Sequence, residues 1–351
     1  MRSFNKIARN IALFIFSFVI GILFFEIFLR TTEIMLPSYV YDNPELGRTQ
    51  KPLALVNTVG AEGFYMGRIN KFGYVAKAYD KEKNKDVFRI ALIGDSYIEG
   101  LQIFERDHFE TYLRQMLSKS INKKVEVLNF GIGGIDLRGM YLRFDKFAKE
   151  YNPDLTLFFA KEEDLVRKDV LPTPEPYIVK DTIAFNEDFL NTPDSRLRQK
   201  FAFVRAFSVG NLLKEVFEVY HNGLFLNVLF DKFYPEKISI EPPLKKTYSI
   251  QNDKFYLINK KIFEILAGKQ DLKYHPVIVQ VEDFPLYYNE LLQELKIKIF
   301  PLKDELGKYN ELELTYWKAS GKIGHWNHFA HMVVGKYLSK QISLLYESFH
   351  L

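Results

Sequence analysis

Apolar segments typical of strands alternate with amphipathic segments typical of helices over most of the chain after residue 86. The first, residues 87–94, reads VFRIALIG, a continuous aliphatic and β-branched run that is typical of a strand buried on both faces. Such alternation predicts a three-layer α/β/α sandwich, with a mostly parallel sheet of about five strands covered on both faces by helices. The expected strands are 87–94, 125–131, 153–160, 275–282 and 296–300, and the expected helices are 104–120, 136–150 and 331–346.

A serine follows the first expected strand, in the sequence Gly94-Asp95-Ser96. Parallel α/β folds place their reactive groups at the carboxyl ends of the strands. A serine hydroxyl at this point faces the cleft, and its backbone N–H lies at the start of the next helix, where negative charge is favoured. The competing interpretation is a serine that only caps that helix, and an isolated Gly-Asp-Ser would favour it.

Two further blocks accompany this serine. The sequence NFGIGG (residues 129–134) begins within the end of the second expected strand and continues beyond it, and GHWNHFAH (residues 324–331) leads into the last expected helix. Together with GDSYIEG (residues 94–100), these blocks resemble the SGNH, or GDSL-like, hydrolase family in their order and in the elements that they follow. The lead-in sequence around Arg68 and Gly73 is similar to that of membrane-anchored members associated with cell-envelope polysaccharide.

The resemblance implies roles for individual residues. Ser96 would be the nucleophile and His325 its base, and the backbone N–H groups of Ser96 and Gly134 would hold the oxyanion. The residues expected to support the site from behind it are Asp95, Asn129 and Asp164.

Two positions depart from the family pattern. Glu163 stands where the third block of the family has an asparagine that donates to the oxyanion, and an ionised carboxylate cannot donate. Losing one such donor typically costs about 2.7–4 kcal/mol in the barrier. Lys322 and Ile323 occupy the positions where the family usually has an aspartate that orients the histidine. We expect Glu163 to face the cleft, where it either suppresses acyl chemistry by repulsion or orients His325; a dyad without a carboxylate is the third alternative.

The N-terminal region contains an apolar stretch from Ile11 to Leu29, about 19 residues, which is close to the length needed to span hydrocarbon. Arg2, Lys6 and Arg9 precede it, so the positive-inside bias predicts a single-pass anchor in the cytoplasmic membrane, with the N-terminus inside and the C-terminal domain periplasmic. A cleaved signal peptide would have a shorter apolar stretch and a cleavage site of small residues, which are absent here. Glu26 interrupts the stretch near its outer end, where it can reach lipid headgroups or face a partner helix.

These patterns divide the chain into a cytoplasmic tail (1–9), a transmembrane anchor (10–30), a stem and lead-in (31–86) and an SGNH-like domain (87–351) with an insertion at about 170–270. The insertion contains an aromatic, helical segment at 203–234. Charged residues interrupt this segment, so it is a poor candidate for a second membrane span. We expect the insertion to lie over the sheet edge or the face of the active site.

Composition excludes several classes of function. The chain has no cysteine, which removes disulfides, thiolate metal sites and cysteine nucleophiles. The formal net charge of +4 does not indicate a nucleic-acid binder. His325, His328 and His331 are spaced by three but have no carboxylate ligand beside them, so we expect no metal; Asp136 breaks the dinucleotide-binding glycine pattern, and we expect no organic cofactor.

The resemblance and the predicted location together imply a membrane-anchored serine esterase or O-acyltransferase that acts on acyl esters of a cell-envelope glycan. The expected partners are that acylated glycan, membrane lipid around the N-terminal helix, and a membrane acyltransferase. The alternative is a catalytically impaired SGNH-like domain that binds glycan or scaffolds a membrane assembly. Glu163 and Ile323 favour the alternative, whereas Ser96, Gly134 and His325 oppose it.

Overall fold

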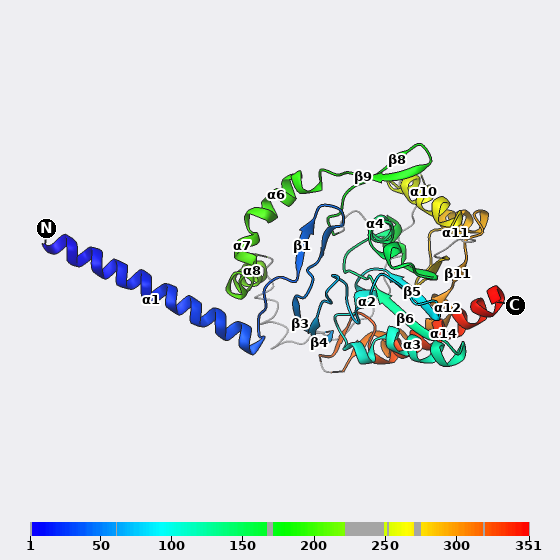
Figure 1. The fold of residues 1–351 in the computed structure, drawn as a ribbon, viewed down its shortest axis with the longest axis horizontal. Helices are drawn as coiled ribbons and strands as arrows, with labels where there is room; N and C mark the ends of the chain where they lie inside the picture. The colour runs from blue at the N-terminus through cyan, green and yellow to red at the C-terminus, as the bar shows by residue number, and fades with distance from the viewer. Residues whose placement is uncertain are drawn as a thin grey trace. The chain divides into compact units, whose positions relative to one another are not determined.

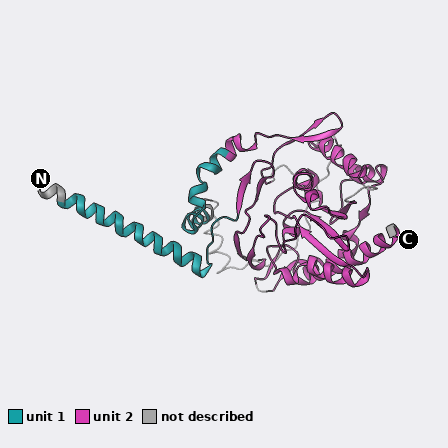
Figure 2. Cartoon of the chain, viewed as in Figure 1, with its two compact units in different colours: residues 1–39, 196–246 teal, residues 40–195, 247–351 magenta. Residues whose placement is uncertain are grey.

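The computed structural model describes all residues except 1, 61, 167–170, 222–248, 251–252, 270–274, 319 and 351. The chain forms two compact units (Figure 2). The smaller unit, shown in teal, comprises residues 1–39 and 196–246, and the larger unit, shown in magenta, comprises residues 40–195 and 247–351.

A five-stranded sheet, in which every neighbouring pair is parallel, forms the centre of the larger unit. The strand order is β11-β10-β7-β5-β6. The sequence prediction of a mostly parallel five-stranded sheet is confirmed, and each strand lies within its expected segment or begins one residue before it. The strands are β5 (Val87–Ile93), β6 (Lys124–Asn129), β7 (Leu155–Ala160), β10 (Pro276–Gln280) and β11 (Ile299–Phe300).

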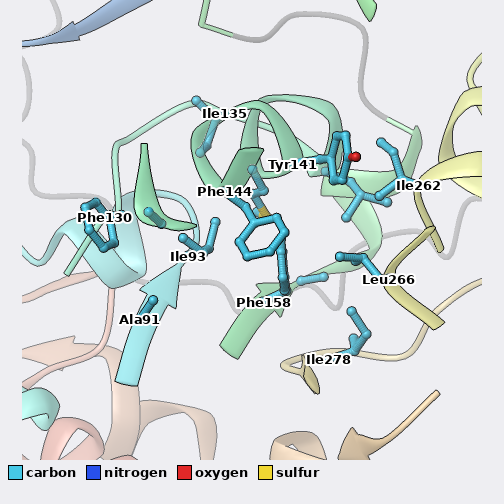
Figure 3. Packing of buried hydrophobic residues seen from close by; sticks show 14 of the residues in the cluster. Ala91, Ile93, Phe130, Ile135, Tyr141, Phe144, Phe158, Ile262, Leu266 and Ile278 are labelled. Carbon is cyan, nitrogen blue, oxygen red and sulfur yellow. The ribbon is translucent and has the colours of Figure 1, made fainter. Parts of the chain in front are cut away.

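Helices cover both faces of this sheet. Successive side chains of each strand point to opposite faces, and since the strands are largely apolar, both faces are buried. Ala91 and Ile93 of β5 belong to one hydrophobic cluster, whereas Ile90 and Leu92 belong to the other. Figure 3 shows the first cluster, in which the rings of Phe144 and Phe158 meet edge to face at 5.5 Å. The helices on that face are α4 (Leu137–Lys146), α10 (Tyr256–Ala267) and α11 (Leu286–Glu294); those on the other are α3 (Phe109–Ser120), α12 (Leu302–Leu306) and α14 (His328–His350) (Figure 1).

Short elements complete the larger unit. The helical ones are α2 (Ser96–Glu99), η1 (Glu105–Asp107), η2 (Ala148–Tyr151), α5 (Glu162–Val166), η3 (Phe189–Asn191) and α13 (Glu311–Thr315). Four antiparallel hairpins accompany them: β1–β2 (Val40–Asn43, Gly47–Gln50), β3–β4 (Leu55–Gly60, Gly63–Arg68), β8–β9 (Pro176–Val179, Thr182–Phe185) and β12–β13 (Tyr316–Trp317, Lys322–Ile323).

Residues 40–86 are part of the larger unit, although we expected a stem and lead-in that ended at residue 86. Gln50 of β2 is fully buried, accepts a hydrogen bond from Arg143 at 3.0 Å and donates one to Glu99 at 2.8 Å. This segment joins the unit both through such buried hydrogen bonds and through Tyr74 and Tyr79, which belong to the first hydrophobic cluster. Neither kind of contact leaves a regular apolar period in the sequence.

The expected insertion at 170–270 is not a single structural element. The hairpin β8–β9 and helix α10 belong to the larger unit, where α10 contacts α4 and both hairpin strands. Residues 196–221 instead belong to the smaller unit, with the N-terminal helix. Residues 222–234 of the expected aromatic segment lie outside the described residues.

The smaller unit contains α1 (Arg2–Thr32), α7 (Ala202–Arg205) and α8 (Ser208–His221), and α6 (Pro193–Lys200) ends within it. Residues Lys6–Thr32 of α1 form a helix that is long and apolar enough to cross a membrane, with a mean hydropathy of 2.7.

Candidate active site

Ser96 lies at the point where the strand order of the sheet reverses. Strand β5 is paired with β6 on one side and with β7 on the other, so the chain leaves β5 in one direction and crosses back over it to reach β7. Crevices outside the carboxyl ends of strands at such a point are the usual ligand sites of open α/β sheets. Asp95 caps the short helix α2 here, because its carboxylate accepts the Tyr97 N–H at 3.0 Å.

His325 lies beside Ser96 although 229 residues separate them. The Oγ atom of Ser96 and the Nε2 atom of His325 are 2.7 Å apart, within hydrogen-bond distance. The ring of Tyr97 packs against the His325 ring with centroids 4.6 Å apart. The predicted proximity of Ser96 and His325 is confirmed, and their catalytic roles stay predictions.

Glu62 contacts the other side of the same imidazole. Its Oε2 atom accepts the backbone N–H of His325 at 2.9 Å and also contacts the ring Nδ1. Burial opposes ionisation of Glu62, but these hydrogen bonds and the nearby imidazole outweigh it and lower the pKa of the carboxyl below its ordinary value. An ionised Glu62 holds the proton on Nδ1, which leaves Nε2 free to accept from the Ser96 hydroxyl.

The contact between Glu62 and His325 depends on tight packing around a hairpin turn. Glu62 lies between the paired residues Gly60 and Gly63 of β3 and β4. A Cβ atom at Gly324 would lie only 2.2 Å from the carboxyl carbon of Glu62, so no larger side chain fits there. The indole N–H of Trp317 donates to the His325 carbonyl at 3.1 Å and fixes the histidine backbone from the other direction.

Glu163 is not the carboxylate that orients His325. The two ring nitrogens of His325 are engaged by Ser96 and by Glu62, so neither is available to Glu163. Glu163 lies in α5 and is exposed. The prediction that Glu163 orients His325 is therefore wrong. Glu62, in a hairpin distant in sequence, contacts Nδ1 of His325 and takes that position instead. A suppressing effect of Glu163 on acyl chemistry stays a prediction.

The glycine-rich loop after β6 provides one N–H that is available at the site. A Cβ atom at Gly133 would lie 3.4 Å from the Cβ of Ser96, so this loop lies against the serine. The Gly133 N–H is already used, since it donates to the Glu99 carboxylate at 2.8 Å. Gly134 has φ of +83°, a conformation that favours glycine, and in the described part of the chain its N–H has no protein acceptor. That Gly134 and Ser96 donate to an oxyanion stays a prediction.

Asn129 connects the serine helix to the glycine loop. Its side-chain amide donates to the Ile98 carbonyl at 2.6 Å and accepts the Gly131 N–H at 2.9 Å. The residue is 1% exposed, so both bonds are shielded from water. Asn129 therefore fixes the spacing between the two segments that carry the predicted oxyanion donors.

Lys161 is a charged neighbour of the site that the sequence did not single out. Its Nζ atom lies 2.7 Å from Asp95 Oδ2 and 4.6 Å from the centre of the Tyr97 ring. Burial opposes the charge on Lys161, but Asp95 and Asp164 outweigh it and raise the pKa of the lysine. Asp164 accepts the backbone N–H of Lys161 at 2.8 Å, and burial together with Asp95 raises the pKa of Asp164 well above its ordinary value. The ammonium thus steadies the carboxylate that caps the serine helix.

The other two histidines of the last block have structural contacts. His331 Nδ1 accepts the Phe109 N–H at 3.2 Å, and the His328 ring packs against Trp317. Within the described ranges, no three histidine, aspartate or glutamate side chains form a group that could hold a metal ion.

Glu62 is the site residue that sequence reasoning missed. The two glycines around it, between segments of alternating polarity, are typical of a hairpin. That signal predicts a turn, but it says nothing about a partner 263 residues away.

No protein-family model matches the chain, and no curated protein sequence matches it. Among solved structures, the chain is similar to a G-D-S-L family protein from Desulfitobacterium hafniense DCB-2, with 12% identity, a TM-score of 0.38, and 72% of this chain and 98% of that one covered. It is also similar to a lipase/acylhydrolase from Enterococcus faecalis (10%, TM-score 0.35, coverage 73% and 95%). A third similar structure is a catalytic mutant of an acetylxylan esterase from Geobacillus stearothermophilus (9%, TM-score 0.36, coverage 75% and 96%).

Proposed function

We propose that this protein is a serine ester hydrolase with Ser96 as its nucleophile. The observation that carries the proposal is the continuous series of contacts from the Glu62 carboxylate through both nitrogens of His325 to the Ser96 hydroxyl. A serine hydroxyl is a weak nucleophile by itself, and an oriented histidine that removes its proton is the usual means of activating it.

The reaction begins when Ser96 Oγ attacks the ester carbonyl carbon and its proton passes to His325 Nε2. The Glu62 carboxylate stabilises the imidazolium formed in this step, and the N–H groups of Ser96 and Gly134 receive the negative oxygen. Collapse of the tetrahedral intermediate breaks the ester C–O bond, and the leaving alcohol takes its proton from His325. Water then attacks the acyl-serine with His325 as base, and this releases the acid and restores Ser96.

For the substrate, we propose the O-acyl esters of a cell-envelope glycan. The support is the predicted topology, in which α1 spans the cytoplasmic membrane and the larger unit lies outside it. A glycan hydroxyl that replaces water in the second step would make the protein an O-acyltransferase, and a membrane acyltransferase is the proposed source of acyl groups. Alkaline phosphatase, which is active only outside the cytoplasm, should be active when fused to the C-terminus. If instead a reporter that is active only in the cytoplasm works at that position, the proposed location in the envelope is wrong.

The nucleophile is tested with a fluorophosphonate probe on the full-length protein in detergent. Wild type should be labelled, Ser96→Ala should not, and His325→Ala should be labelled far more slowly. Ser348→Ala removes an exposed hydroxyl elsewhere on α14 and should label like wild type. Absence of labelling in a protein shown to be folded would refute the hydrolase and favour the glycan-binding or scaffolding alternative, which the glutamate at position 163 supports.

A further inference from the structure

The smaller unit contains a buried acid in a helix that is otherwise exposed. Side chains of α1 from residue 6 to Thr32 are almost all exposed, yet Glu26 is only 7% exposed. Its two carboxylate oxygens accept the backbone N–H groups of Ser208 and Val209, each at 2.9 Å, and Arg30 pairs with it at 2.5 Å. A charged side chain inside a bilayer is costly unless polar partners surround it, and these groups provide them.

The same contacts fix helix α8 beside the outer end of α1. Arg30 also donates to the Ala206 carbonyl at 2.9 Å, and Asn211 donates to the Leu36 carbonyl at 3.0 Å. Glu26 precedes Arg30, where the expected transmembrane anchor ends, by four residues, which is a rise of about 6 Å along the axis. The first turn of α8 is therefore held at the depth of about 5–10 Å that interfacial amphipathic helices reach.

Helix α8 has an apolar face that the described part of the chain leaves exposed. Leu213, Val216 and Tyr220 lie on that face and are 62%, 58% and 79% exposed. Lys214 and Glu215 lie on the polar side and pair with each other at 3.1 Å. Exposed apolar side chains gathered on one face mark a surface that contacts something other than water.

We propose that α8 is a second membrane-contacting element, which lies in the outer interface of the bilayer with its apolar face in the acyl chains. The support is its attachment to the apolar helix α1 through Glu26 and Arg30, the depth that this attachment sets, and Tyr220, a residue type enriched at membrane–water interfaces. In this arrangement Glu26, which lies in the transmembrane segment of α1, accepts the first N–H groups of the interfacial helix α8. This inference rests on the proposed membrane anchoring by α1 and is independent of the ester hydrolase activity.

The test uses the full-length chain in proteoliposomes of phosphatidylethanolamine and phosphatidylglycerol. Because the protein has no cysteine, single cysteines for a nitroxide label can be introduced without other changes. Collision of each label with oxygen, which concentrates in acyl chains, is compared with collision with a water-soluble nickel chelate. Leu213→Cys and Val216→Cys report on the apolar face, Glu215→Cys is the matched control on the polar side, and Phe16→Cys reports on the middle of α1.

Labels at Leu213 and Val216 should favour oxygen as the label at Phe16 does, and the label at Glu215 should favour the nickel chelate. Adding Glu26→Ala should shift the two α8 labels towards nickel, whereas Glu26→Gln, which keeps an acceptor oxygen, should shift them less. If Phe16 reports acyl chains but Leu213 and Val216 report water, the inference fails while the anchor stands. Shielding of both labels from both reagents would mean that protein covers the face, and this also overturns it. Nickel access at Phe16 would instead refute the membrane anchor.

Discussion

The substitution Glu62→Gln tests whether the hairpin carboxylate takes part in the reaction. Both hydrogen bonds from His325 end on a single oxygen, Oε2. The amide oxygen of glutamine can accept both of them, so the ring keeps its orientation and its proton on Nδ1. Glu62→Gln therefore removes the charge and little else, whereas Glu62→Ala removes the charge and both hydrogen bonds.

The magnitude follows from the contact and its exposure. Opposite charges in contact at about 2.8 Å interact by about 1.5 kcal/mol in water and about 6 kcal/mol at an effective dielectric constant of about 20. The side chains of His325 and Glu62 are 27% and 35% exposed, so solvent screens the pair and the smaller half of this interval applies. We expect Glu62→Gln to lose about 2–3 kcal/mol of transition-state stabilisation, a fall of about 30- to 160-fold in kcat. Glu62→Ala should lose about 1–3 kcal/mol more, for the two hydrogen bonds.

Hydrolysis of p-nitrophenyl acetate by the full-length protein measures both effects, and thermal unfolding checks that each variant is folded. Glu45→Gln, an exposed acid in the β1–β2 turn, is the matched control and should keep wild-type turnover. Gly324→Ala is an independent perturbation, since its Cβ would displace the Glu62 carboxyl group, and its kcat should fall towards that of Glu62→Ala. Gly268→Ala, where a Cβ atom meets nothing closer than 3.7 Å, should be neutral. A folded Glu62→Ala variant with turnover within about threefold of wild type, under 1 kcal/mol, would refute the role of Glu62.

Two further predictions concern buried charges near the site. Lys161→Met leaves the 8%-exposed Asp95 without its cation and should destabilise the protein by about 3–5 kcal/mol in urea unfolding. Adding Asp95→Asn should recover part of that loss, and a double variant as unstable as the sum of the singles would contradict the pairing. Glu110 is fully buried with both carboxylate oxygens lacking a hydrogen bond in the described part of the chain, and burial together with Glu105 raises its pKa from 4.5 to about 8. Between pH 4.5 and about 8 the carboxyl of Glu110 is protonated in the folded state but ionised in the unfolded state. The proton bound at Glu110 therefore contributes fully to folding stability below pH 4.5, and this contribution is lost as the pH rises towards 8. Unfolding free energy in urea should therefore fall by up to about 4 kcal/mol more in wild type than in Glu110→Gln across this range, and parallel pH profiles would contradict it.

The sequence predicted the elements whose periodicity is regular. The five parallel strands and the position of Ser96 at the end of β5 follow from apolar runs and from the way parallel sheets expose their strand ends. His325 could be matched to Ser96 because three sequence blocks occur in order. Each of these signals is local, or depends on the order of local signals along the chain.

Local sequence signals could not predict the roles of Glu62 and Lys161, because tertiary packing determines which residues they contact. Glu62 is one acid in a hairpin turn, and its contact with His325 depends on the space left at Gly324 and on the backbone N–H of His325. The pairing of Lys161 with Asp95 requires the carboxyl ends of β7 and β5 to be adjacent, which depends on strand order rather than on sequence pattern. The same argument explains why residues 40–86 were expected to be a lead-in.

The hairpin that carries Glu62 has a consequence for how the protein gains activity during synthesis. Of the three groups in the proposed site, two come from the first third of the chain, at positions 62 and 96, and one comes from near its end, at position 325. During synthesis, Glu62 and Ser96 are made long before His325. The contacts from Glu62 through His325 to Ser96 therefore cannot form until synthesis is nearly complete and the C-terminal segment has packed. For the same reason a fragment that begins at residue 87 would contain the whole sheet and still lack the carboxylate. An inactive fragment of that kind would reveal nothing about the intact protein.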